Sequence, residues 1–239
     1  MDEALQVADV PARRGAAWLG EAFSIFREQP LNWIALCVGW AIIWIVLLFV
    51  PLVGLVTANL LQPVFFGSFA IAAYKHTAGE RVAMGDLFSA FRRSFRPLFN
   101  IGFLMMLAQL ASVFLMRALG LPSWPADRDL DLYAYAEMLR DSRWVLLAGL
   151  AVTTFASAAL WFAPPLIVFH GMPASHAIRW SVYAALSNAG AMIVYGVILM
   201  VLMILAWLPF GLGLFVLLPV LVISTYTSYR DIFDHRPPG

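Results

Sequence analysis

Few residues in this sequence have the type and spacing that catalysis or metal binding requires. His170 and His176 stand six positions apart, and two imidazoles could share a metal ion, but no third ligand lies near them. No HExxH, GxSxG or phosphate-loop motif occurs in the chain. We therefore predict no catalytic residue, no metal and no cofactor, and we expect that the protein is not an enzyme.

Three aspartates, Asp127, Asp129 and Asp131, alternate in the way that begins a calcium-binding loop. Such a loop needs glycine at its sixth position and glutamate at its twelfth, where this chain has Leu132 and Met138. The pattern therefore favours a solvated loop over a calcium site.

The stretch 161–165 reads WFAPP and places two adjacent prolines inside an apolar run. A proline within a helix removes a backbone donor and clashes with the preceding turn. We predict a structural kink at Ala163, Pro164 and Pro165 that frees carbonyl groups one turn earlier. Two interpretations stay open: a packing bend within a helix bundle, or a broken helix that lines a substrate path.

A stripe of small residues precedes these prolines. Gly149, Thr153 and Ser157 recur at every fourth position. Small residues at this spacing let two membrane helices approach closely, so we predict that the stripe packs against another helix.

Neutral polar residues within the apolar runs are the remaining candidates for a site. Ionisable residues are missing from the middle of every predicted span, which argues against proton-coupled transport. Neutral amides and hydroxyls can still hydrogen-bond another helix or a neutral ligand. The candidate polar lining comprises Asn59, Gln62, Gln109 and Thr154.

Long apolar helices must position all of these residues. Hydrophobic residues make up 62% of the 239-residue chain, and charged residues make up 12%. The stretches 31–74, 97–116, 144–178 and 180–229 contain no Asp, Glu, Lys or Arg. Because a helix needs about 20 apolar residues to cross a bilayer, the two longest stretches can each hold two spans. We predict six transmembrane helices, at 31–52, 55–75, 97–118, 143–170, 188–208 and 213–230.

The basic residues indicate how these spans are oriented. With six spans both termini lie on one side, and that side holds 11 of the 15 lysines and arginines. Cytoplasmic loops of membrane proteins carry such an excess. We therefore predict that both termini are cytoplasmic.

Three amphipathic segments lie on this predicted cytoplasmic side, at 12–28, 84–98 and 174–187. Each has apolar residues at helical spacing on one face and polar residues opposite, which is typical of helices in a membrane interface. Each segment precedes two spans, so we predict a threefold repeat. In this repeat Glu21 aligns with Asp86 and, more distantly, with His176.

The predicted fold class is therefore an all-α polytopic membrane protein with a single membrane domain, 1–239. Its repeat units are 12–75, 84–170 and 174–230. An outer-side insertion at 118–142 interrupts the second unit, and its C-terminal half is expected to form a short amphipathic helix.

Four motifs carry a resemblance to a known family: VPARRG at 10–15, GDLF at 85–88, WFAPP at 161–165 and YRDIF at 229–233. The chain resembles a family of uncharacterised six-span bacterial inner-membrane proteins, mainly from beta-proteobacteria, over nearly its whole length. Its repeated pattern is loosely similar to the membrane domain of some glycerophosphodiester phosphodiesterases, and we expect no counterpart of their attached catalytic domain within these 239 residues. The resemblance implies an all-helical fold in the bacterial inner membrane and identifies no functional residue.

Two functions are compatible with this sequence. The first is an accessory or scaffolding component of a membrane complex or of lipid organisation, with the lipid bilayer, other inner-membrane proteins or a second copy as partners. The alternative is a passive transporter of lipid or small molecules that uses the kinked fourth span. A filled interior would favour the first, and a cavity that tapers to Pro164 would favour the second. The net charge of +1 indicates no nucleic-acid partner.

Overall fold

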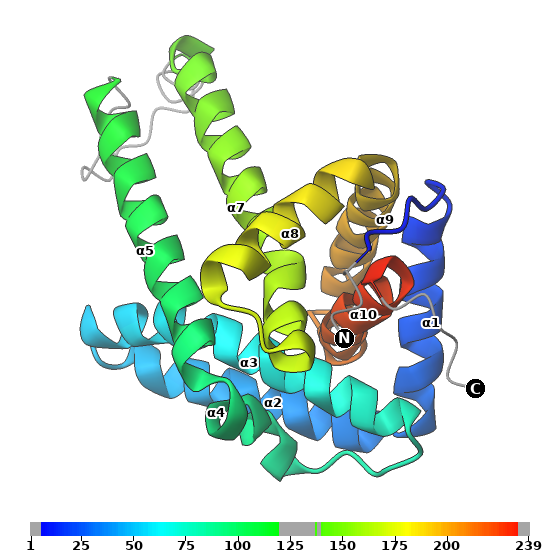
Figure 1. The fold of residues 1–239 in the computed structure, drawn as a ribbon. Coiled ribbons are helices and arrows are strands. Elements are labelled where there is room, and N and C mark those ends of the chain that lie inside the picture. The colour runs from blue at the N-terminus through cyan, green and yellow to red at the C-terminus, as the bar shows by residue number, and fades with distance from the viewer. Residues whose placement is uncertain (1–5, 120–136, 138–139, 234–239) are drawn as a thin grey trace.

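The computed structural model describes residues 6–119, 137 and 140–233, and for 150–160 it describes the backbone alone. This part of the chain is helical and contains no strand. Its elements follow one order three times: a short helical segment, then two long helices (Figure 1).

The first set comprises α1 (Arg14–Glu28), α2 (Pro30–Leu48) and α3 (Val53–Thr77). Pro30 begins α2, where its missing N–H has no helical partner to lose. The turn into α3 is tight, because Leu52 takes a positive φ of 62°. Gly54 follows at once, and a Cβ there would overlap the carbonyl of Leu47. The close crossing of α2 and α3 therefore depends on this glycine.

The second set comprises η1 (Met84–Phe88), α4 (Ser89–Arg93), α5 (Phe95–Ala118) and α7 (Arg143–His170). The predicted amphipathic helix 84–98 is wrong in its extent. It starts as a 3-10 turn and stops at Ser94, so Phe95 and Leu98 belong to the long helix α5. The helix predicted within 118–142 lies almost wholly outside the described residues.

The third set comprises α8 (Ala174–Ser187), α9 (Ala189–Trp207) and α10 (Leu214–Phe233). The bounds of α8 are those predicted from its apolar spacing. Gly171 separates α7 from α8 with a φ of 64°, a backbone conformation that glycine adopts without strain.

Among the described residues, four helices are long and apolar enough to cross a membrane: α2, α3, α5 and α9. Helices also occupy the positions of the fourth and sixth predicted spans, as α7 and α10. The C-terminal half of α10 carries a run of hydroxyls and two charges, and these residues are largely buried by protein. The six-span count stays a prediction.

The short segments pack in a ring. Segment η1–α4 lies on α3, α8 lies on α7, and α1 lies on α10. The long helices α3, α7 and α10 also contact one another at the centre. The chain therefore closes on itself, because its first helix packs on its last (Figure 1).

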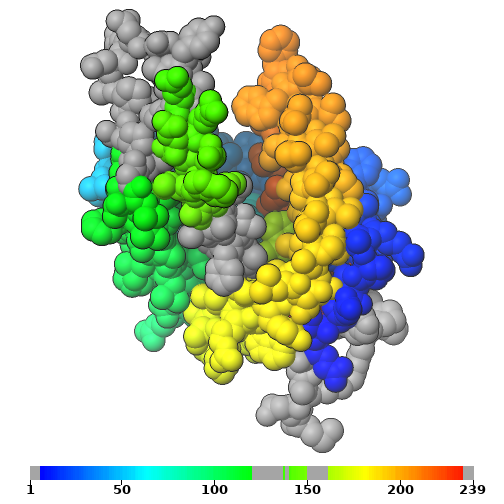
Figure 2. All heavy atoms as spheres, turned by 90° about the horizontal axis from the view of Figure 1, so that it is seen from above, coloured from blue at the N-terminus to red at the C-terminus, as the bar shows by residue number. Residues whose placement is uncertain are grey.

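The long helices separate at the ends that lie away from the packed body (Figure 1). Helices α5 and α7 rise together away from the body, whereas α2 and α3 run across its base (Figure 1). Seen from above, the molecule is hollowed between the N-terminal end of α7 and helix α9 (Figure 2). Large apolar side chains are exposed along these outer parts, among them Phe49, Phe114, Trp144 and Ile204.

Candidate functional site

The prolines of α7 lie in the packed part of the molecule. The helix runs without a break from Arg143 to His170, so Pro164 and Pro165 do not end it, and the bend of its axis stays a prediction. Ala163 and both prolines are buried. The N–H of Phe162 donates to the hydroxyl of Ser181 on α8 at 3.0 Å. Phe162, Ala163 and Leu166 belong to the buried apolar core.

The small-residue stripe makes at least one close helix contact. A Cβ on Gly149 would lie 2.5 Å from the Sδ atom of Met116, so α5 approaches α7 closely there. The side chains of Thr153 and Ser157 lie outside the described part of the structure, as does that of Thr154. Their roles stay predictions.

The predicted polar lining shows no common site. Asn59 is exposed, and its amide donates to the carbonyl of Leu55 in its own helix at 2.8 Å. Gln109 is exposed on α5, and Gln62 is half-buried on α3. Within the described structure none of these three hydrogen-bonds another, so their role as a lining stays a prediction.

The junction of α1 with α10 holds a network of ion pairs and hydrogen bonds. Asp231 accepts hydrogen bonds from Arg14 Nε at 2.7 Å and from the indole of Trp18 at 2.8 Å. Glu21 bridges Arg14 at 2.9 Å and Arg230 at 3.1 Å. The hydrogen bond that Arg14 donates to Asp231 raises the pKa of Arg14 above its ordinary value. These bonds join the two ends of the chain.

The junction of α3 with η1 repeats this chemistry with fewer groups. Lys75, near the end of α3, lies 3.1 Å from Oδ1 of Asp86. Asp86 also accepts a hydrogen bond from the N–H of Ala83 at 2.8 Å. Glu21 and Asp86, which align in the sequence repeat, thus both pair with a basic residue near the end of the long helix on which their segment lies.

Asn188 holds the segment that precedes α1. This residue ends α8 and is 2% exposed. Its Oδ1 accepts from the N–H of Val10 at 2.8 Å, and its Nδ2 donates to the carbonyl of Ala8 at 3.0 Å. One side-chain amide therefore satisfies two backbone groups, as a neighbouring strand would.

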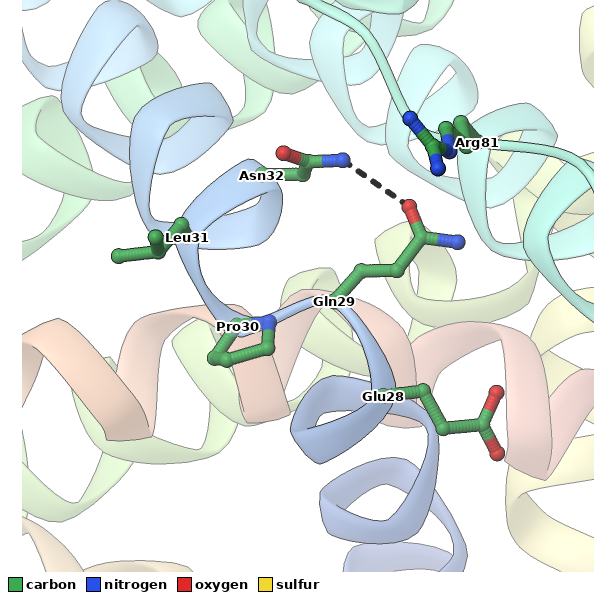
Figure 3. A pocket seen from close by; sticks show the side chains of 6 residues that line it. All are labelled: Glu28, Gln29, Pro30, Leu31, Asn32 and Arg81. Atoms are coloured by element: carbon green, nitrogen blue, oxygen red, sulfur yellow. Dashed lines mark hydrogen bonds between the residues drawn. The ribbon is translucent and has the colours of Figure 1, made fainter.

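Gln29 does the same for the segment that precedes η1. It ends α1, accepts from the N–H of Val82 at 3.0 Å and donates to the carbonyl of Glu80 at 3.1 Å. Asn32 donates to the same Oε1 atom at 3.0 Å (Figure 3). We call the contacts of Asn188 and Gln29 the amide clamps. A pocket of about 410 Å³ lies here, and Figure 3 shows its lining: Glu28, Gln29, Pro30, Leu31, Asn32 and Arg81.

The third junction, between α7 and α8, differs from the other two. Four residues on one face of α8 line a pocket of about 500 Å³: His176, Arg179, Trp180 and Tyr183. His176 occupies the position that aligns with Glu21 and Asp86, so a basic group replaces the acid. We call this cavity the α8 pocket.

Two further histidines make internal contacts that the sequence did not indicate. His76 is buried, accepts from the indole of Trp33 at 3.0 Å and lies 3.2 Å from Glu28. His170 contacts the hydroxyl of Tyr229 at 2.7 Å. In the described ranges no group of three His, Cys, Asp or Glu residues could hold a metal ion.

Helices that are long and apolar enough to cross a membrane, with polar junctions where the short helices pack on them, are typical of an integral membrane protein. The chain is 28% identical over 261 residues to a protein of Burkholderia thailandensis that is named a probable inner membrane protein, covering 98% of this chain and 96% of the relative. No family model matches the sequence. No solved structure matches either. The location in the bacterial inner membrane is therefore supported by both the helices and the relative.

Proposed function

We propose that the chain crosses the inner membrane six times and consists of three repeat units, 12–75, 84–170 and 174–230, with both termini in the cytoplasm. The ring of contacts supports this, because each short segment packs on the long helix that precedes it in the cycle. The two amide clamps support it further. Each joins the end of one unit's short segment to the chain that enters another unit.

We further propose that the protein is a non-catalytic component of the inner membrane that organises lipid or a neighbouring membrane protein. One observation carries this proposal: the inner ends are filled and bonded together, while the outer helices separate and expose apolar side chains. A surface of this kind is made for contact with lipid or with another protein rather than for holding a substrate in a closed site.

The test is to isolate the protein under mild conditions and identify what accompanies it. The full chain would be extracted with a polymer that retains native lipid, then run on native gels and crosslinked. We expect a defined partner protein or an enriched lipid class. A lone chain with the bulk lipid composition of the membrane would contradict the proposal.

Passive transport of lipid is the second candidate, and the hollow between α7 and α9 favours it (Figure 2). Helix α7 is packed further along, where Ala163, Pro164 and Pro165 are buried. A liposome assay that follows fluorescent phospholipid between leaflets distinguishes the two functions. The scaffold proposal expects the rate of protein-free liposomes, whereas a rate that rises with protein content would favour transport.

A further inference from the structure

The α8 pocket gathers two kinds of side chain on one helical face. His176, Arg179, Trp180 and Tyr183 follow the spacing i, i+3, i+4, i+7, so they stand side by side along α8. The opposite face, with Ala177, Ser181 and Ala184, is buried against the body. The rings of Trp180 and Tyr183 meet edge to face at 6.0 Å. Two aromatic rings and two basic side chains therefore line the pocket together.

The basic groups of this pocket have no acid to neutralise them within the described structure. Arg179 and His176 are exposed, and neither forms an ion pair there. At the other two junctions the aligned acids, Glu21 and Asp86, bind a base of the same chain. On α8 the aligned position holds His176 and forms no such pair in the described structure, so the exposed guanidinium of Arg179 is available to an anion from outside.

We propose that the α8 pocket binds the phosphate headgroup of an anionic phospholipid. Arg179 would bind the phosphate oxygens, because a guanidinium matches that geometry. Trp180 and Tyr183 lie beside it as the amphipathic rings that settle at the headgroup level of a membrane. This proposal rests on the proposed function, since it places α8 at the anionic cytoplasmic leaflet.

A lipid fits these observations better than a soluble phosphate. The pocket opens on the surface of α8, and α8 continues directly into α9, a helix apolar enough to cross the membrane. An acyl chain beside α9 and a headgroup at α8 would extend in the same direction. A free phosphate would use the arginine and leave the two aromatic rings without a role.

Binding is measured on the full chain in detergent micelles by native mass spectrometry, with phosphatidylglycerol or phosphatidylcholine added in equal amounts. We expect selective retention of phosphatidylglycerol. Arg179→Gln should weaken it about fivefold, the effect of one basic residue at an anionic surface. Trp180→Leu should weaken it also. The matched control is Arg93→Gln, an exposed arginine of α4 outside the pocket.

Three outcomes would overturn the proposal. One is equal retention of the two lipids. Another is an equal loss in Arg93→Gln and Arg179→Gln, which would indicate attraction by charge alone. The third is displacement of the lipid by glycerol phosphate at the same concentration, which would assign the site to a soluble phosphate. Micelles have no sidedness, so a failure of the proposed scaffold or orientation would leave this binding intact.

Discussion

At two junctions of the molecule an acid of the short segment pairs with a base, whereas at the third the aligned residue, His176, is exposed. Where α1 meets α10 and where η1 meets α3, an acid of the short segment binds a base of the long helix. An amide clamp lies beside each of these junctions. Where α8 meets α7 the contact is close, whereas His176 and Arg179 in the α8 pocket are exposed.

The paired junctions and the unpaired α8 pocket are expected to contribute differently to folding and to ligand binding. A buried or half-buried pair that satisfies itself contributes to folding and has no capacity left for a ligand. An exposed arginine and histidine beside two aromatic rings contribute little to folding, because water already solvates them. The same architecture can therefore be structural at two of its joints and a binding surface at the third.

The largest expected effect comes from the junction of α1 with α10. Asp231→Ala should lower the free energy of unfolding by about 2–3 kcal/mol, because it leaves Arg14 and the indole of Trp18 without their acceptor. Denaturation in mixed micelles measures it. The control is Glu80→Ala, whose carboxylate is 64% exposed and 3.9 Å from Lys75, with an expected change below about 0.5 kcal/mol. Equal losses in the two variants would contradict the assignment of this junction as the main joint.

The amide clamps should come next. Asn188→Ala should cost about 1–2 kcal/mol and speed hydrogen exchange at the amide of Val10, since that N–H loses its acceptor. Gln29→Ala should do the same at Val82 with a smaller loss of stability, because Gln29 is less buried. Exchange measured by mass spectrometry reports each site separately. Unchanged exchange at Val10 in Asn188→Ala would show that the clamp does not hold that segment.

The long-range contacts are also where prediction from the sequence failed. The helices follow from apolar spacing and turn residues, so the bounds of α8 were predicted correctly and those of α1 nearly so. Asn188 holds the segment that precedes α1, and no sequence pattern pointed to its counterpart before η1. The structure shows that Gln29 has this role, at the end of α1.

The reason is physical. Helix periodicity is a local signal, whereas Asn188 meets Val10 and Asp231 meets Arg14 across nearly the whole chain. Those contacts form only because α1 packs on α10, and no local sequence pattern encodes that packing. The α8 pocket was missed for a related reason: His176 and Arg179 are ordinary on an amphipathic helix until the other junctions show that an acid stands in the same place.

The junction of α3 with η1 should give a smaller effect that can be reversed. Lys75→Glu should destabilise the protein by about 0.5–1 kcal/mol, because it sets a second acid beside Asp86. Adding Asp86→Lys restores opposite charges and should recover part of the loss. A double-mutant cycle gives the coupling energy of the pair. A coupling of zero would show that the pair contributes nothing to this joint and that the comparison rests on the α1–α10 junction alone.

The smallest change in stability, and the sharpest test of the comparison, is expected from His176→Glu. This substitution gives the third junction the acid that the first two possess. The introduced carboxylate would lie one helical turn before Arg179, where an exposed pair contributes about 0.3–0.5 kcal/mol at most, so the free energy of unfolding should hardly move. The binding of phosphatidylglycerol should nevertheless fall, since the new carboxylate occupies Arg179 and repels the phosphate. His176→Gln removes the basic group without adding an acid and should have a weaker effect. If both variants bind the lipid as the native chain does, open charge at the third junction is not what distinguishes it from the other two.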